Sequence, residues 1–229
     1  MSHRLLLPLI ALLLAGCASM APDTPRPTVD PLQWHAVALP GKNPTLYARS
    51  SKDGRPAWSA RSERSASMWR RKLAPGAPGE VSFSWWVDSP IHGASVADVD
   101  REDAPARVIF AFAGDVRQLP ARTRMKFELA EALTGEAPPY ATLMYVWESK
   151  DAAAGTVIIN PRSDRIRKIV LDAGSHNLRR WRDHRRDLAA DFRLAFGEEP
   201  GALLAVAKMT DTDNTGSTAE TWYGPVVLH

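Results

Sequence analysis

Hydrophobic and polar residues alternate in several short segments of the chain, which is typical of strands with one buried face. In segment 81–87 (VSFSWWV), Phe83 and Trp85 share one face, and Ser84 and Trp86 share the other. Short segments rich in β-branched and aromatic residues also occur at 106–114, 142–149, 155–160, 165–172, 202–209 and 223–229. This pattern predicts an all-β fold, an antiparallel β-sandwich of jelly-roll type.

Two segments follow a helical pattern. Segment 187–200 (DLAADFRLAFGEEP) offers Asp187 as N-cap, carries apolar residues on one face and ends at Gly197. Segment 122–136 (RTRMKFELAEALTGE) has a weaker helical pattern. Segment 177–186 (NLRRWRDHRR) fits either a strand or a helix. We therefore expect one or two short helices at the edge of the sandwich.

The N-terminus carries an export signal. Residues 1–16 have a short positive start, an apolar stretch of about ten residues and small residues at the end. The stretch is shorter than the roughly 20 apolar residues that span a bilayer. The sequence LAGC ends at Cys17 and resembles a bacterial lipobox, whose cysteine is acylated. The alternative is an ordinary signal peptide followed by a chance cysteine.

This signal predicts the domain organisation and the location. We expect a lipoprotein signal peptide at 1–16, a proline-rich tether at 17–32 and a single β-sandwich domain at 33–229. Ala18 follows Cys17 where aspartate would favour the inner membrane, by resemblance to enterobacterial sorting rules. The expected partner is therefore the outer membrane, reached through a lipid anchor, with the domain facing the periplasm.

Composition narrows the function classes. The chain has 229 residues and a net charge of +3, and it has no lysine-rich block, so we expect no nucleic-acid binding. Cys17 is the only cysteine, which excludes an internal disulfide. The sequence contains no GxSxG motif, no phosphate-binding glycine loop and no HxxxH or HxH pair, so neither a nucleophile elbow nor a zinc site is expected.

An acidic loop near the C-terminus is the candidate metal site. Asp211, Asp213 and Asn214 precede Gly216 in the sequence DTDNTG, which resembles the start of an EF-hand loop. Trp222 stands where that loop needs a glutamate, so an EF-hand is rejected. A calcium site completed by oxygens from distant loops stays open. The alternative is a turn in which these side chains bond their own backbone.

Trp86 is the candidate ligand-binding aromatic. It shares its strand face with small polar residues, and Ser84 and Asp88 flank it. Such a face can line a sugar-binding groove, because the ring stacks on the sugar and polar neighbours bond its hydroxyls. The alternative is that a loop or the proline-rich region covers Trp86.

Segment 88–107 holds a group of carboxylates. Asp88, Asp98, Asp100 and Asp103 are candidate acids for an enzyme acting on polysaccharide. The alternative is a solvated acidic loop, in which Asp103 forms a structural ion pair with Arg107. The arginines of segment 179–186 could contact an acidic glycan, and the alternative for them is a solvated face.

The order of several motifs resembles a known family. They are FSWWVDSPI, REDAPARVIFAFAGD, LMYVWES, RIRKIVLDAG, DLAADFRLAFGEEP and AVAKMTDTDNTGSTAETWYGPVVL. Together they resemble the bacterial domain-of-unknown-function family 3047 over about residues 34–228. The resemblance implies architecture and carries no activity. Pro225 stands where that family tends to place an aspartate.

We expect a non-catalytic binding domain for glycan or another envelope polymer. One alternative is a polysaccharide-active hydrolase or lyase, and another is a structural accessory lipoprotein that contacts an envelope protein. No cofactor other than calcium is expected.

Overall fold

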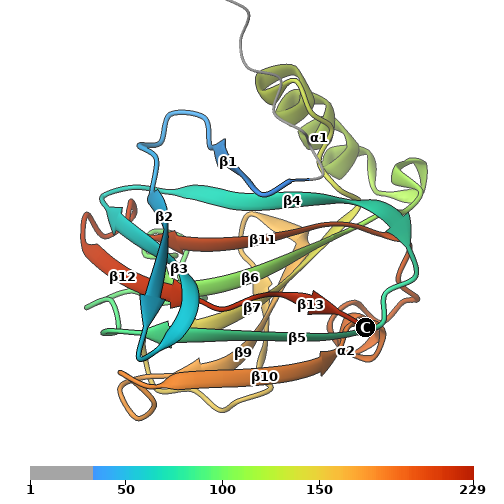
Figure 1. Cartoon of the computed structure of the whole chain (residues 1–229). Helices are drawn as coiled ribbons and strands as arrows, with labels where there is room; N and C mark the ends of the chain where they lie inside the picture. Colours follow the sequence, from blue (N-terminus) through green and yellow to red (C-terminus); the bar gives the residue numbers. More distant parts are fainter. Residues whose placement is uncertain (1–32) are drawn as a thin grey trace, which may run out of the picture.

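The protein is described by a computed structural model that places residues 33–229. Figure 1 shows a sandwich of two β-sheets. The seven-stranded sheet has the order β1 (His35–Ala38), β4 (Ser67–Gly76), β11 (Leu203–Asp211), β6 (Ala104–Phe112), β7 (Ala141–Glu148), β9 (Ser163–Ala173) and β8 (Val157–Asn160). The six-stranded sheet has the order β10 (Trp181–Asp187), β5 (Glu80–Val87), β12 (Thr218–Tyr223), β3 (Arg55–Glu63) and β2 (Leu46–Lys52), with β13 (Val227–Leu228) also paired to β5.

The β-sandwich predicted from the alternation is confirmed. Trp85 on β5, Phe110 on β6 and Tyr145 on β7 are fully buried between the sheets, as their positions in the pattern require. One feature differs from a purely antiparallel fold, since β7 and β9 run parallel. The predicted signal peptide, Cys17 and the tether lie outside the described residues.

Both predicted helices are present. The helix α2 (Leu188–Phe196) begins at Asp187, whose carboxylate accepts hydrogen bonds from the amides of Ala189 (2.9 Å) and Ala190 (3.0 Å). It ends at Gly197, which has the left-handed φ of +72° that favours glycine. The ambiguous segment at 177–186 supplies strand β10 at the edge of the six-stranded sheet.

The second helix, α1 (Ala121–Thr134), follows a short 3-10 turn, η1 (Val116–Gln118). It projects from one end of the sandwich, and none of its residues is buried (Figure 1). Neither α1 nor α2 is long and apolar enough to cross a membrane.

Two tight connections determine how the predicted site residues are placed. Strands β2 and β3 are joined by Asp53 and Gly54, which have φ angles of +48° and +76°. An Asp-Gly pair is the preferred sequence for such a two-residue hairpin turn. Residues 212–217 connect β11 in one sheet to β12 in the other, so this segment crosses the edge of the sandwich.

Candidate functional site

Trp86 lies in a row of tryptophans on the outer face of the six-stranded sheet. Trp181 on β10, Trp86 on β5 and Trp222 on β12 occupy opposite positions of the paired strands. The rings of Trp86 and Trp222 meet edge to face, with 5.0 Å between their centroids. The sequence therefore placed Trp86 on the correct face of its strand.

The turn between β2 and β3 covers this row. The amine of Lys52 lies 3.8 Å from the centroid of the Trp86 ring and 4.0 Å from that of Trp222. The indole nitrogen of Trp86 donates to the carboxylate of Asp53 at 2.8 Å. Only 5% of Trp86 is exposed. The ring face that was expected to stack on a sugar is thus occupied by a lysine of the same chain.

Ser84 and Asp88 do not complete a groove with Trp86. Ser84 lies in a shallow depression with Ser82, Asp183, Arg185 and other residues of the β5, β10 and β13 region. Asp88 lies next to Arg179, 3.5 Å from its guanidinium. The predicted open groove over Trp86 is therefore not formed, and the alternative, a covering loop, describes the arrangement.

The candidate acids in the loop before β6 have structural partners. Asp103 is fully buried and accepts hydrogen bonds from the backbone amides of Asn214 (3.2 Å) and Thr215 (2.7 Å). Asp98 accepts from the amide of Asp100 at 3.0 Å within a turn. These contacts give both carboxylates a role in holding the loops together.

Arg107 pairs with Asp211 rather than with Asp103. Its guanidinium makes two hydrogen bonds to the Asp211 carboxylate, at 2.8 and 2.9 Å, and both side chains are almost fully buried. Burial raises the pKa of Asp211 to about 6, and Arg107 opposes this shift. The expected ion pair between Asp103 and Arg107 is thus replaced by one that joins β6 to β11.

Two of the three residues proposed to bind calcium, Asp211 and Asp213, lie close together, and Asp103 joins them where Asn214 was expected. Each of these three aspartates places one carboxylate oxygen within 4.8 Å of an oxygen of the other two, namely Asp103, Asp211 and Asp213. Each carboxylate already has a partner, because Asp211 binds Arg107, Asp213 pairs with Lys42 and Asp103 binds the turn amides. Asn214 contributes its backbone amide to Asp103. A calcium ion would have to displace the two cations, which favours the turn interpretation.

We expect calcium to have no effect on thermal stability. A ligand that binds only the folded state at a hundred times its Kd adds about 2.7 kcal/mol, which would raise the melting temperature by several degrees. The melting temperature should be the same in millimolar calcium and in chelator. A rise in calcium that is lost in the Asp213→Asn variant would instead establish a calcium site at this cluster.

A different group of side chains has the features of a binding site. We call it the aromatic–cationic cluster, and it lies where β1, β2, β3, β4 and β11 meet at one edge of the sandwich. Its members are Trp34, Tyr47, Arg49, Trp58, Trp69, Arg71 and Lys208.

The aromatic rings of the cluster come from both sheets. The rings of Trp58 on β3 and Trp69 on β4 have centroids 4.7 Å apart, and Tyr47 on β2 stacks on Trp69 at 5.7 Å. Trp58 on β3 lies opposite the core residue Tyr223 on the neighbouring strand β12, so Trp58 is on the inner face of its sheet. All three rings remain partly exposed, so they form the open end of the core.

The three cations lie against these rings. Arg49 lies 5.7 Å from the Trp58 ring, and Arg71 and Lys208 lie 5.5 and 4.8 Å from the Trp34 ring. Such distances allow cation–π attraction. Lys208 is opposite Trp69 on β4 and opposite the core residue Val108 on β6, so its side chain points into the sandwich.

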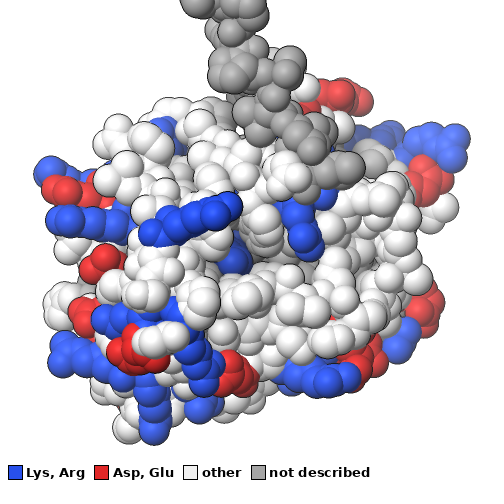
Figure 2. All heavy atoms as spheres, in the orientation of Figure 1, with Lys and Arg blue, Asp and Glu red and all other residues white. Residues whose placement is uncertain are grey.

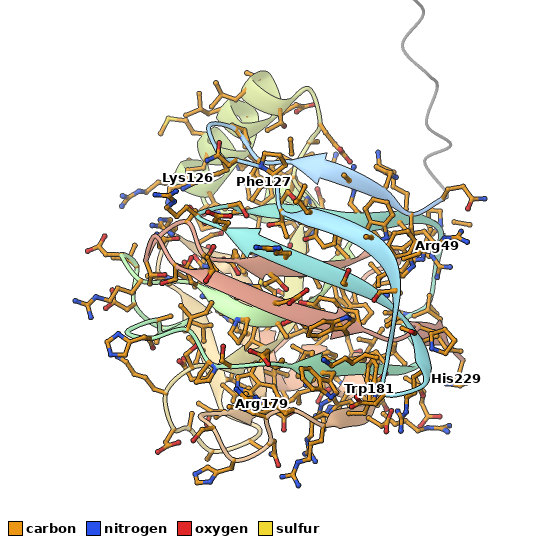
Figure 3. All side chains as sticks on the ribbon, turned by 60° about the vertical axis from the view of Figure 1, so that its left-hand side comes forward. Arg49, Lys126, Phe127, Arg179, Trp181 and His229 are labelled. Atoms are coloured by element: carbon orange, nitrogen blue, oxygen red, sulfur yellow. The ribbon has the colours of Figure 1, made fainter. Side chains whose placement is uncertain are left out.

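The space-filling view shows the surroundings of this edge. In Figure 2, blue Lys and Arg side chains lie at and within a hollow near the centre of the face, and the red Asp and Glu side chains lie towards its rim. Figure 3 shows Arg49 extending from β2 on the same side of the molecule. The face is therefore basic at its centre.

None of these residues was predicted as a site. A signal was present, because Tyr47 and Arg49 on one strand, and Trp69 and Arg71 on another, place a cation two residues from an aromatic on the same face. Lys208 also interrupts the apolar face of its strand.

Comparisons with known proteins give a family and distant structural similarities. The family model described as "Protein of unknown function (DUF3047)" matches residues 32–227. No curated protein matches the chain. A solved structure, the xyloglucanase domain of NopAA, a type three effector from Sinorhizobium fredii in complex with cellobiose, is 8% identical, with a TM-score of 0.43. The match covers 86% of this chain and 93% of that one.

Proposed function

Since the chain belongs to the DUF3047 family of proteins of unknown function, we propose its role from the geometry of the aromatic–cationic cluster. The protein is a non-catalytic binding domain for an envelope polymer, and a glycan fits the cluster best. The observation that carries this proposal is the set of partly exposed rings of Tyr47, Trp58 and Trp69. Flat aromatic faces next to hydrogen-bonding groups suit the C–H faces and hydroxyls of sugar rings.

The export signal supports a location next to such polymers. We propose that Cys17 is acylated after removal of residues 1–16, and that residues 17–32 tether the domain to the outer membrane on its periplasmic side. Several acyl chains on one cysteine provide stable anchoring, because each buried methylene contributes about 0.8 kcal/mol. A binding domain held in this way would connect the membrane to its ligand.

Binding is favoured over catalysis because two of the candidate acids have structural partners. Asp103 holds the backbone of the segment between β11 and β12, and Asp88 lies beside Arg179. A glycosidase needs one carboxylic acid and one free carboxylate on either side of the scissile bond. The cluster itself is built from rings and cations.

We expect Trp58→Ala to weaken glycan binding by about two- to twelvefold, since an aromatic contact contributes about 0.5–1.5 kcal/mol and about 1.4 kcal/mol is a factor of ten. The measurement is retention of the protein on peptidoglycan sacculi and on a panel of immobilised polysaccharides. Trp222→Ala is the matched control, because Trp222 is also partly exposed but lies on the outer face of the sheet.

The two variants separate binding from folding. Both remove a tryptophan from the six-stranded sheet, so a general loss of structure should reduce binding in both. Equal retention of Trp58→Ala and wild type on every polymer that the wild type binds would rule out the cluster as the binding site.

A further inference from the structure

We propose that the ligand of the aromatic–cationic cluster is an acidic saccharide, in which a carboxylate or phosphate group on the sugar binds between Arg71 and Lys208. This inference rests on the proposed function and names its ligand class. It depends on the cations and on the unpaired donors of the cluster, whereas the glycan proposal depends on the rings.

The environment of Lys208 is the first observation. Only 3% of the residue is exposed, and its amine donates one hydrogen bond, to the backbone oxygen of Gly224 at 2.8 Å. A protonated amine has three N–H donors, so two of them are left without a hydrogen bond to the described residues. Trp34 lies beneath it and Arg71 close by, and no carboxylate of residues 33–229 forms a salt bridge with either cation.

Two other buried cations of the same sandwich, in contrast to Lys208, each have a carboxylate partner. Lys168 is fully buried, and its amine lies 2.6 Å from the carboxylate of Glu102. Arg107 is buried against Asp211. In this fold a buried structural cation thus comes with its own acid, as the cost of burying a charge requires. Lys208 lacks that acid, which indicates that the negative charge comes from a ligand.

Unpaired donors are the second observation, and they do not depend on the charge of Lys208. The indole nitrogen of Trp69 and the Nε of Arg71 are buried and have no hydrogen-bond partner among the described residues. Both side chains leave β4 on its inner face, two residues apart. Buried polar groups without a partner are rare and call for an explanation. Both groups are donors, so the missing partner is a hydrogen-bond acceptor.

Together the observations describe a ligand with two parts. The rings of Trp58 and Trp69 suit the flat face of a sugar, and the donors of Trp69, Arg71 and Lys208 suit an anionic oxygen group attached to it. A guanidinium beside an ammonium favours carboxylate or phosphate over a neutral hydroxyl. Uronic acids, sugars with acidic ether substituents and sugar phosphates all have this combination.

The test uses pairs of saccharides in which one member carries an acidic group and the other has that group neutralised or removed. Oligogalacturonate is compared with its methyl ester, peptidoglycan fragments with their amidated form, and a phosphorylated oligomannoside with its dephosphorylated form, by isothermal titration calorimetry on the whole protein. We expect at least one acidic member to bind, and its neutral counterpart to bind at least tenfold more weakly. The pair that responds distinguishes a carboxylate from a phosphate ligand.

Three variants assign the effect to the cluster. Arg71→Met should remove most of the preference for the acidic form, and Trp69→Phe, which keeps a ring but loses the N–H donor, should reduce it. Arg61→Met removes the same charge from the exposed outer face of β3 and should leave the preference unchanged.

The possible results separate the two proposals. Equal affinity for both members of a pair, or binding of neutral glycans alone, overturns the acidic-ligand inference and leaves the glycan-binding function standing. Binding to no saccharide of any kind overturns both. A preference that is lost equally in Arg71→Met and Arg61→Met would show general charge attraction and would also overturn the inference.

Discussion

Replacing Asp211 with alanine should lower the free energy of unfolding by about 3–5 kcal/mol, the range found when one partner of a buried ion pair is removed. Arg107, whose side chain is 3% exposed, would lose both hydrogen bonds to its main acid and keep only the longer contact with Glu102, 3.9 Å away. The amide of Ala104 would also lose its acceptor on Asp211. Urea denaturation followed by tryptophan fluorescence measures the change.

The neighbouring carboxylate provides the control for this experiment. Asp213 pairs with Lys42, whose side chain is 44% exposed, so Asp213→Ala should cost at most about 1 kcal/mol. Similar losses in the two variants would contradict the assignment of Asp211 as the structural member of the cluster. A double variant, Arg107→Met with Asp211→Leu, should recover much of the stability, because both members of the buried pair are removed and Glu102 keeps its contacts with Lys168 and Arg162.

The fold could be predicted from local patterns because the sandwich is built from them. Alternation in 81–87 fixes which side of β5 enters the core, since side chains on a strand repeat with a period of two. The helix at 188–196 was recognisable because Asp187 and Gly197 cap it by contacts within the same segment. The parallel pairing of β7 and β9 was not predictable, because alternation carries no information about strand direction.

The site could be predicted less well, because contacts between distant segments decide it. The local pattern placed Trp86 on the outer face correctly. Its exposure depends on Lys52 and Asp53, more than thirty positions away, and on the hairpin turn that brings them over the ring. An Asp-Gly pair predicts a turn, but it does not say which surface the turn will cover.

In the aromatic–cationic cluster, a charged residue occupies a position that the alternation of β11 assigns to the core. Alternation in β11 places Val206, Lys208 and Thr210 on the inner face, and Lys208 is the only charged member. Sequences usually agree with their fold at every level, and departures tend to coincide with functional sites. A lysine in an inward position was therefore the most informative exception in this chain.

Replacing Lys208 with methionine should stabilise the protein by about 1–4 kcal/mol at neutral or lower pH, the range seen when buried charges give way to apolar side chains. Burial, and next the nearby Arg71, lower the pKa of Lys208 to about 7. Besides Arg71, the groups facing it are the Trp34 ring, its β4 neighbour Trp69 and the backbone oxygen of Gly224. None of these supplies a compensating negative charge.

The sign of the pH dependence follows from the lowered pKa. Below pH 7 both the folded and the unfolded chain hold the proton of Lys208, so the cost of burying the charge is fully present. Between pH 7 and about 10.4, the ordinary lysine pKa, only the unfolded chain holds it, so stability should rise with pH through this group. Denaturation at several pH values should show this rise for wild type and for Lys72→Met, which removes a more exposed lysine, but not for Lys208→Met.

The same titration should control the binding of an acidic saccharide. An anion next to Lys208 favours its charged form, so binding should take up a proton near neutral pH and weaken as the pH rises above 7. In Lys208→Met the affinity should be lower, and it should no longer fall across this range. A pH dependence that is identical in the variant and in wild type would mean that the ligand does not contact Lys208. Stability and affinity should therefore change in opposite directions with pH, because the buried charge that costs stability is the one that attracts the ligand.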